Sequence, residues 1–298
     1  MTNICTIADD NFRLRFLAMR ESIVRHNSKY NLNLLCLDDS IYEFISKKCS
    51  DVNCYRIEDL VKEDPELSAA RDNNPSREAL NVSKGNIEDA KRLQFIWALA
   101  SYFSWYCLKK LNLSDILYVD ADIYFFNSME YIEELKFLGS IGLIENRIPD
   151  TSVNGRFNVG IIYFKNDIQG LSCCEFWKKC LLNPGNEYYN EYGACGDQKY
   201  LELFDKLYED VFIFDDYIGH LAPWSLPYHK FIGNKAMWNG KFQDIIFFHF
   251  SNFDYNFEEG TYIPARRHNI VALPHNSTPH QMYEEYYKCL EGLNEDSI

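Results

Sequence analysis

Cysteine motifs with a recognisable chemical role are absent from this chain of 298 residues. Its ten cysteines are scattered, none forms a CxxC pair, and none has the spacing of a zinc site. This excludes a sequence-defined zinc module and a CxxC redox motif. Buried, unpaired thiols are typical of a reducing compartment, so we expect a cytoplasmic protein.

Long apolar runs are also missing. The longest, LQFIWALASYFSWYCL at residues 93–108, contains Gln94, Ser101 and Ser104 and is about one turn short of a membrane-spanning helix. Residues 1–16 lack the apolar core of a signal peptide and carry acidic side chains. We therefore expect residues 93–108 to form a buried helix, and any membrane contact to be peripheral.

Positive charge is in deficit, with 30 Lys and Arg against 44 Asp and Glu and a net charge of −14. A field of this sign repels nucleic acid and anionic lipid, which excludes a general nucleic-acid-binding surface. An anionic substrate would need a local positive centre. The composition is otherwise globular, at 47% hydrophobic residues.

Short apolar runs alternate with helical patterns, which predicts an α/β fold with a mixed, mostly parallel sheet flanked by helices. Residues 60–90 interrupt the alternation, being polar and without a clear period, and are predicted to form a lid or an acceptor-binding loop. The predicted strands are residues 4–8, 33–37, 52–57, 116–126, 140–145, 159–164, 211–214 and 244–250. The predicted helices are residues 14–25, 41–48, 93–108, 129–135, 174–182, a helix from Asp197, and 280–293.

Asp120 and Asp122 stand one residue apart in an otherwise apolar run, ILYVDADIYFF at residues 116–126. In an extended segment such positions share one side, so the spacing predicts that both carboxylates project together. Removing these charges from water is costly unless they are compensated, and Mg²⁺ or Mn²⁺ completed by substrate phosphates would compensate them. The simpler interpretation is two aspartates that cap a turn at a strand end.

Polar side chains at four further positions could complete such a site: residues 6–11 (TIADDN), Asn158 with Gly160, Asp197 with Gln198, and His249. The first group follows a strand, where open α/β sheets bind nucleotides. Taken singly, each has a structural explanation, such as a helix cap for Asp197 or a satisfied buried histidine for His249. Their order along the chain favours function.

This order resembles the GT-A class of nucleotide-sugar glycosyltransferases, in particular glycosyltransferase family 8 and related bacterial enzymes, from about Ile4 to His249. The resemblance implies a metal site for Mn²⁺ or Mg²⁺ at Asp120, Asp122 and His249, and roles at the reacting sugar for Asp197 and Gln198. It implies that the donor contacts the following residues: Ile7, Ala8, Asp9, Asn11, Arg92 (or Lys91), Asp120, Ala121, Asp122 and Asn158.

The chain departs from the family pattern after His249, where the family carries a lysine that reaches the diphosphate. Here the sequence reads HFSNFDYNF, without lysine, so Arg266, Arg267 and Lys235 are the candidates for that charge. We predict a transferase domain at residues 1–255 and a C-terminal extension, ending in a helix, at residues 256–298.

The function that the resemblance implies is metal-dependent transfer of a hexose from a nucleotide-diphosphate donor, a UDP-sugar, to a hydroxyl of a glycan or glycolipid, with retention of configuration. The acceptor is expected at residues 60–90 and 183–195, where Tyr188, Tyr189 and Tyr192 are the aromatic candidates. Two alternatives stay open: a phosphohydrolase of the haloacid dehalogenase type, and an inactive carbohydrate-binding protein.

Overall fold

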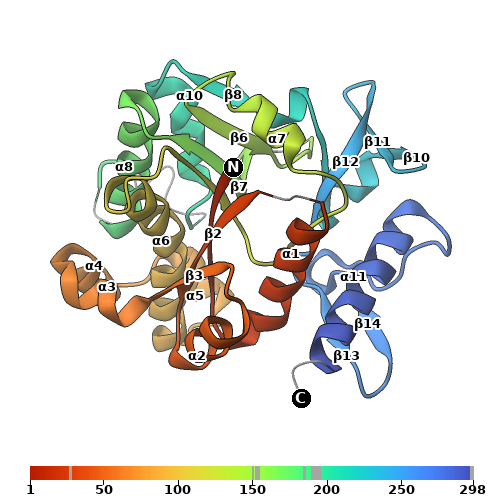
Figure 1. Ribbon diagram of the computed structural model, residues 1–298, viewed down its shortest axis with the longest axis horizontal. Coiled ribbons are helices and arrows are strands. Elements are labelled where there is room, and N and C mark those ends of the chain that lie inside the picture. Colours follow the sequence, from red (N-terminus) through yellow and green to blue (C-terminus); the bar gives the residue numbers. More distant parts are fainter. Residues whose placement is uncertain (27–28, 150, 152–154, 184–185, 189–195, 296–298) are drawn as a thin grey trace.

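A seven-stranded sheet forms the centre of the molecule, in the order β3-β2-β1-β4-β7-β6-β8 (Figure 1). The computed structural model describes residues 1–298 except 27–28, 150, 152–154, 184–185, 189–195 and 296–298. Strands β3, β2, β1 and β4 are parallel, β7 is antiparallel to both of its neighbours, and β6 is parallel to β8. The strands are β1 (Thr2–Ala8), β2 (Tyr30–Cys36), β3 (Val52–Arg56), β4 (Asp115–Val119), β6 (Ile141–Glu145), β7 (Phe157–Lys165) and β8 (Val211–Ile213).

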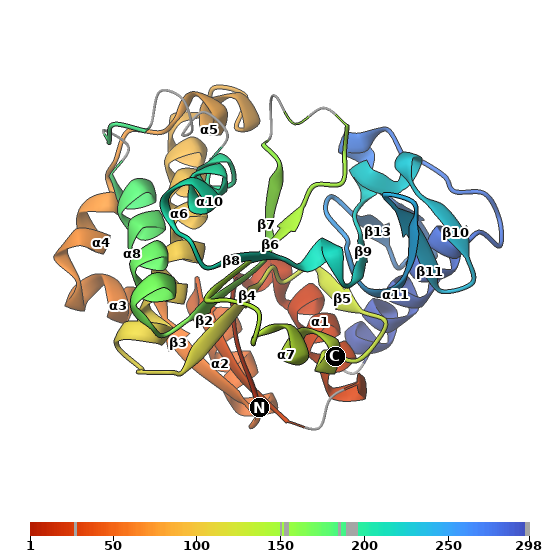
Figure 2. The same ribbon diagram turned by 90° about the horizontal axis from the view of Figure 1, so that it is seen from above.

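Helices cover both faces of this sheet (Figure 2). α6 (Ile87–Lys109) and α8 (Ile168–Leu182) lie on one face, and α1 (Arg13–His26), α2 (Asp39–Lys48) and α7 (Glu130–Leu135) on the other. Side chains alternate between the two cores, so that Tyr118 of β4 packs with α6 while Val119 packs with the α1 side. Burial on both faces explains why the strands read as continuous apolar runs.

The apolar run at residues 93–108 lies within α6, as predicted, and most of its side chains are buried in the core. In the described part of the chain, no helix combines the length and apolar character needed to cross a membrane.

A second, five-stranded sheet in the order β10-β11-β12-β5, with β9 beside β12, adjoins the first. Its strands are β5 (Ile123–Phe125), β9 (Gly219–Leu221), β10 (Lys230–Ile232), β11 (Lys235–Trp238) and β12 (Lys241–His249). The β13 (Asp254–Asn256) and β14 (Thr261–Ile263) hairpin and α11 (Thr278–Glu295) pack here, with the rings of Phe250 and Tyr286 stacked at 3.9 Å between centroids. The terminal helix is confirmed. The predicted division after residue 255 falls within β13 and stays a prediction.

Most of residues 60–90 is helical rather than irregular, and the role of this segment as a lid or acceptor-binding loop stays a prediction. The segment holds the end of α3 (Ile57–Glu63), α4 (Pro65–Arg71), α5 (Arg77–Val82) and the start of α6. Asp64, Ser76 and Asn86 each accept a hydrogen bond from backbone N–H groups at the start of the following helix. Helices of six or seven residues are too short to show a clear period, and their polar caps resemble loop residues.

The helix predicted from Asp197 is a 3-10 turn at Lys199–Leu203 followed by the short α10 (Phe204–Leu207). Three further 3-10 turns shape the molecule near the junction of the sheets. They are η4 (Phe214–Asp216), η5 (Pro223–Tyr228) and η6 (Arg266–His268).

A buried ionic network joins the two sheets. The Arg147 Nε, just after β6, donates to Asp215 Oδ1 at 2.6 Å, and the His220 Nε2 of β9 lies 2.8 Å from the same oxygen. The Arg147 Nη2 also donates to the Ile218 carbonyl at 2.8 Å and to the Gln243 Oε1 of β12 at 3.1 Å. Both charges of the pair are thereby hydrogen-bonded, and β6, β9 and β12 are tied to one point.

Replacing Asp215 by Asn should destabilise the protein strongly. Burial acts to raise the pKa of Asp215, but His220 and Arg147 outweigh it and hold the pKa well below its ordinary value. The ionised carboxylate therefore stabilises the fold above about pH 4, and this contribution is lost as the pH falls further. We expect Asp215→Asn to lower the free energy of unfolding at pH 7 by about 3 kcal/mol, because it leaves Arg147 buried and unpaired.

Urea unfolding at pH 7 and at a series of acidic pH values measures both effects. The neighbouring Asp216 is exposed, and Asp216→Asn is the matched control. Equal losses of stability in the two variants would contradict the role assigned to the network.

Candidate active site

Asp120, Ala121 and Asp122 form the turn by which the chain passes from β4 in the first sheet to β5 in the second. The Ile123 N–H donates to the Asp120 carbonyl at 3.1 Å and closes this turn. The Asp120 N–H donates to the Gly160 carbonyl at 2.9 Å, and the Phe250 N–H to the Asp122 carbonyl at 2.8 Å. The predicted extended arrangement of the two aspartates is therefore wrong: their carboxylates converge because the backbone turns.

His249 stands at the end of β12 and faces both aspartates. Its Nε2 lies 3.1 Å from Asp122 Oδ1 and 3.6 Å from Asp120 Oδ2. One ligand atom from each of the three side chains lies within 4.8 Å of the others, which suits ligands of a single ion. The Tyr118 hydroxyl donates to Asp120 Oδ1 at 2.8 Å and orients that carboxylate. Sequence reasoning missed Tyr118, although its position two residues before Asp120 in the strand was a signal.

The pKa values of the three side chains in this cluster are shifted in different directions. Burial raises the pKa of Asp120, and the neighbouring Asp122 adds to that effect. For Asp122, burial acts in the same direction, but the charge and hydrogen bond of His249 outweigh it and lower the pKa. Burial acts to lower the pKa of His249, yet the two carboxylates raise it. The two carboxylates thus favour a proton on the imidazole, just as they would favour a bound cation.

The donor set fits a divalent metal ion. Two carboxylate oxygens and one imidazole nitrogen suit Mn²⁺, whereas Mg²⁺ favours oxygen ligands alone. Bound there, the ion would balance Asp120 and Asp122 and offer its remaining positions to phosphate oxygens.

Asn158, Asp197 and Gln198 lie beside the acidic turn. The Asn158 Nδ2 donates to Gln198 Oε1 at 2.9 Å and to Asn146 Oδ1 at 3.2 Å. Burial, and then the charge of Asp120, raise the pKa of Asp197 to about 8. Asp197 and Gln198 thus place a carboxyl group and an amide next to the cluster of Asp120, Asp122 and His249.

A cleft of about 710 Å³ contains most of the predicted site. Ala121, between the two aspartates of the turn, also lines it. Ten predicted residues line the cleft: Ile7, Ala8, Asp9, Asp120, Ala121, Asp122, Asn158, Asp197, Gln198 and His249. The structure thus brings together side chains from the ends of β1, β4, β7 and β12.

Two predicted donor contacts lie outside this lining. Asn11 is exposed in η1 (Asp10–Phe12), where its carbonyl accepts a hydrogen bond from Arg15. Arg92 lines an adjoining cavity of about 340 Å³ together with Lys91, and its Nη2 lies 3.0 Å from Asp9 Oδ2. Arg92 therefore reaches the cleft through Asp9.

Several lining residues were not predicted. Trp97 and Trp224 contribute large rings, and Asn252 adopts a left-handed conformation with φ 59°. Glu78 and Val82 come from α5, and Asn146, Ser251 and His268 add polar groups. The sequence offered little signal for these, because they belong to segments that only tertiary contacts bring to the site. Tyr189 and Tyr192 lie outside the described residues, and Tyr188 packs against Phe176 at 5.5 Å between ring centroids.

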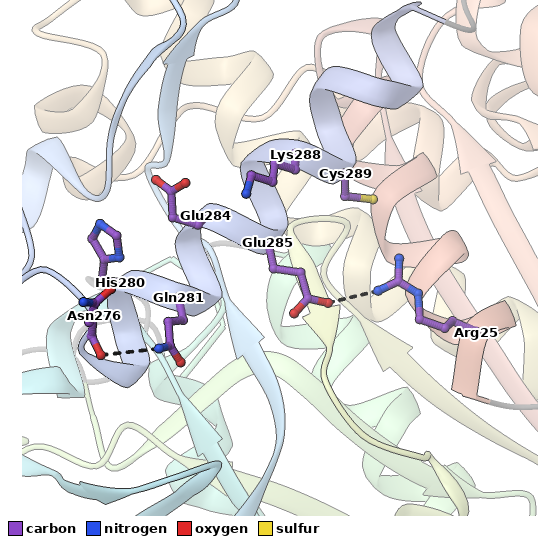
Figure 3. A pocket seen from close by; sticks show the side chains of 8 residues that line it. All are labelled: Arg25, Asn276, His280, Gln281, Glu284, Glu285, Lys288 and Cys289. Carbon is purple, nitrogen blue, oxygen red and sulfur yellow. Dashed lines mark hydrogen bonds and ion pairs between the residues drawn. The ribbon is translucent and has the colours of Figure 1, made fainter.

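A separate hollow lies between α11 and α1 (Figure 3). Its charged groups are partly paired, with Arg25 Nη1 at 2.9 Å from Glu285 Oε1. Its lining shares no residue with the cleft, and no metal-ligand cluster is found there among the described residues. We assign it no role.

Comparison with solved structures shows the fold. Mouse xyloside xylosyltransferase 1 aligns with 83% of this chain and 97% of its own at a TM-score of 0.56 and 12% identity. The galactosyltransferase LgtC, in complex with donor and acceptor sugar analogs, aligns with 76% of this chain and 78% of its own at a TM-score of 0.50 and 12% identity. The chain therefore has the GT-A fold of these glycosyltransferases, as predicted.

Sequence comparison adds relatives without an assigned function. YfnD and YfnF of Bacillus subtilis strain 168, both described as uncharacterized, are 23% and 24% identical to this chain over 260 and 265 residues. The matches span 83% and 84% of this chain and 76% and 80% of the relatives. No family model matches the sequence.

Gly160 permits the close packing of the metal cluster, and its replacement tests that geometry. A Cβ at this position would lie 2.8 Å from His249 Nδ1 and 2.7 Å from Asn158 Oδ1, so both side chains would have to move. We expect Gly160→Ala to weaken Mn²⁺ binding at least tenfold, although it removes no ligand. Isothermal titration with Mn²⁺ measures this, with Asp122→Ala as the variant that loses a ligand.

Gly292→Ala is the control, since a Cβ there meets no atom within 4 Å. Circular dichroism and thermal unfolding establish that the Gly160 variant is folded. Unchanged Mn²⁺ affinity in folded Gly160→Ala would contradict the assignment of His249 as a ligand.

Proposed function

We propose that the protein is a metal-dependent glycosyltransferase that moves a sugar from a UDP-sugar to a hydroxyl of a glycan or glycolipid. The observation that carries this proposal is the convergence of Asp120, Asp122 and His249 within 4.8 Å, in the cleft of a glycosyltransferase fold. The carboxyl ends of β1 and β4 meet at this cleft, where open α/β sheets bind nucleotides.

Different residues of the cleft bind different parts of the donor. Ile7, Ala8 and Asp9 contact the nucleoside, and Arg92 fixes the Asp9 carboxylate through their ion pair. Asp120, Asp122 and His249 hold Mn²⁺, which when bound stabilises negative charge on the departing nucleoside diphosphate. Asn158 and Gln198 bind the sugar and hold each other through one hydrogen bond.

The acceptor enters along a wall formed by Glu78, Val82 and Trp97, which lie on α5 and α6 at the cleft. Gly196 packs directly on Trp97, since a Cβ there would lie 3.0 Å from Cε3 of the indole, and its φ of +64° suits glycine. This contact aligns Asp197 and Gln198 with the same wall. Glu78 and Val82 fall within residues 60–90, where the acceptor is expected, and Trp97 extends the same wall.

Donor hydrolysis without acceptor tests the activity. We expect one nucleotide sugar in a panel of UDP-, GDP-, CDP- and ADP-sugars to be cleaved slowly in the presence of Mn²⁺, and cleavage to stop with EDTA or in Asp122→Ala. Chromatography of the released nucleoside diphosphate measures it.

Other outcomes separate the alternatives. Tight donor binding without turnover for any acceptor would favour a sugar-binding protein. Phosphate release from phosphate monoesters, without cleavage of any nucleotide sugar, would favour a phosphohydrolase.

Retention of configuration is proposed from the resemblance to family 8, whose sugar-site motif Asp197 and Gln198 match. Gln198 lines the cleft and is held by Asn158, which suits a residue that contacts the sugar. Gln198→Ala should lower kcat at least a hundredfold and leave nucleoside diphosphate affinity nearly unchanged, since the amide contacts the sugar and not the phosphates. Proton NMR of the first-formed product establishes the anomeric course. A β-glycoside from an α-linked donor would refute retention and would indicate Asp197 as a general base.

A further inference from the structure

The cleft carries an excess of negative charge that the metal site alone does not balance. Five carboxyl side chains line it: Asp9, Glu78, Asp120, Asp122 and Asp197. Asp9 is paired with Arg92, and the pKa of Asp197 is raised to about 8, so the remaining excess comes from Glu78, Asp120 and Asp122. A divalent ion bound by Asp120 and Asp122 would have its charge offset by these two ligands. A diphosphate placed on that ion would add further negative charge inside a protein whose net charge is −14. A cationic side chain that faces the phosphates would offset this charge.

Most basic side chains near the site are engaged elsewhere. Arg266 Nη2 lies 2.9 Å from Asp254 Oδ2, and Lys235 Nζ lies 3.3 Å from Asp244 Oδ2. Arg15 donates to the Phe253 carbonyl at 3.0 Å and lies over the ring of Tyr255 at 5.3 Å, and its charge acts on Asp122, whose pKa it helps to lower. None of these three lines the cleft.

Arg267 is different. Among the described residues that line the cleft, it is the single lysine or arginine. Its side chain is exposed, and within the described part of the chain it forms no ion pair. It therefore has a guanidinium available for a ligand, on the wall that the C-terminal segment contributes.

The segment that carries Arg267 is anchored next to the metal cluster. Ala265 and Ile270 pair as a β-bridge around η6, and Ala265 is fully buried. The His268 ring packs on Trp224 at 5.4 Å between centroids, and Trp224 packs edge-on to His249 at the same separation. A line of rings thus connects the metal ligand to the residue that follows Arg267.

We propose that Arg267 binds the diphosphate of the donor, so that the C-terminal segment supplies the positive charge missing from the segment after His249. The inference rests on the proposed function, because it requires a nucleoside diphosphate on the metal site. A guanidinium suits this task, since its parallel N–H groups match two phosphate oxygens. In this arrangement Arg267 of η6 and the cluster Asp120, Asp122 and His249 contact the diphosphate together.

Titration of the protein with UDP, CDP, GDP and ADP in the presence of Mn²⁺ tests the proposal. We expect Arg267→Ala to weaken the tightest of these by about 10- to 100-fold, as is typical of a lost hydrogen bond between charged groups, and Arg267→Lys to lose less. Affinity for the corresponding nucleoside, which lacks phosphates, and for Mn²⁺ alone should not change.

Arg266→Ala is the matched control, because it removes an adjacent exposed arginine that is paired with Asp254. Suppose that the wild-type protein binds a diphosphate with Mn²⁺. If Arg267→Ala and Arg266→Ala then weaken this binding equally, or if neither weakens it, the inference is overturned and the proposed function stays intact. If the wild-type protein binds none of the four diphosphates with Mn²⁺, the proposed function fails, and the inference fails with it.

Discussion

The rest of the site depends on the turn at Asp120–Asp122, where two carboxylates must be accommodated at the junction of two sheets. The backbone of this turn is hydrogen-bonded on one side to Gly160 of β7 and on the other to Phe250 after β12. These bonds fix the positions of both aspartates before any ligand is present. His249 completes the cluster from the same end of β12, so the register of the strands determines the spacing of the ligands.

A site assembled from two sheets requires a rigid junction, and the protein secures β12 from both sides. On one side, Arg147 and Asp215 connect β6 to β9 and β12 through a buried network. Such a pair adds little net stability because desolvation opposes it, but its hydrogen bonds allow only one geometry. On the other side, Phe250 stacks on Tyr286 of α11. The C-terminal segment thus supports the site and also lines it.

Some features of the site could not be predicted from the sequence, for physical reasons. The short helices α4 and α5 were not predicted because their polar caps and few residues give no period, and tertiary packing on α6 and α8 stabilises them. Trp97 and Trp224 line the cleft, but no nearby sequence motif indicated that these two side chains would reach it. The role of Arg92 at the donor stays a prediction, and its ion pair with Asp9 depends on the packing of α6 against β1.

The sequence by itself determined the alternation of strands and helices and the burial of both sheet faces, because periodicity and composition report burial directly. It also showed an acidic pair in one apolar run and a histidine at the end of another. Only the tertiary structure decided that Asp120 and Asp122 occupy a turn between sheets, that His249 faces them, and that Arg267 rather than Arg266 lines the cleft. These outcomes depend on strand order and on pairings between distant segments, and no local pattern encodes them.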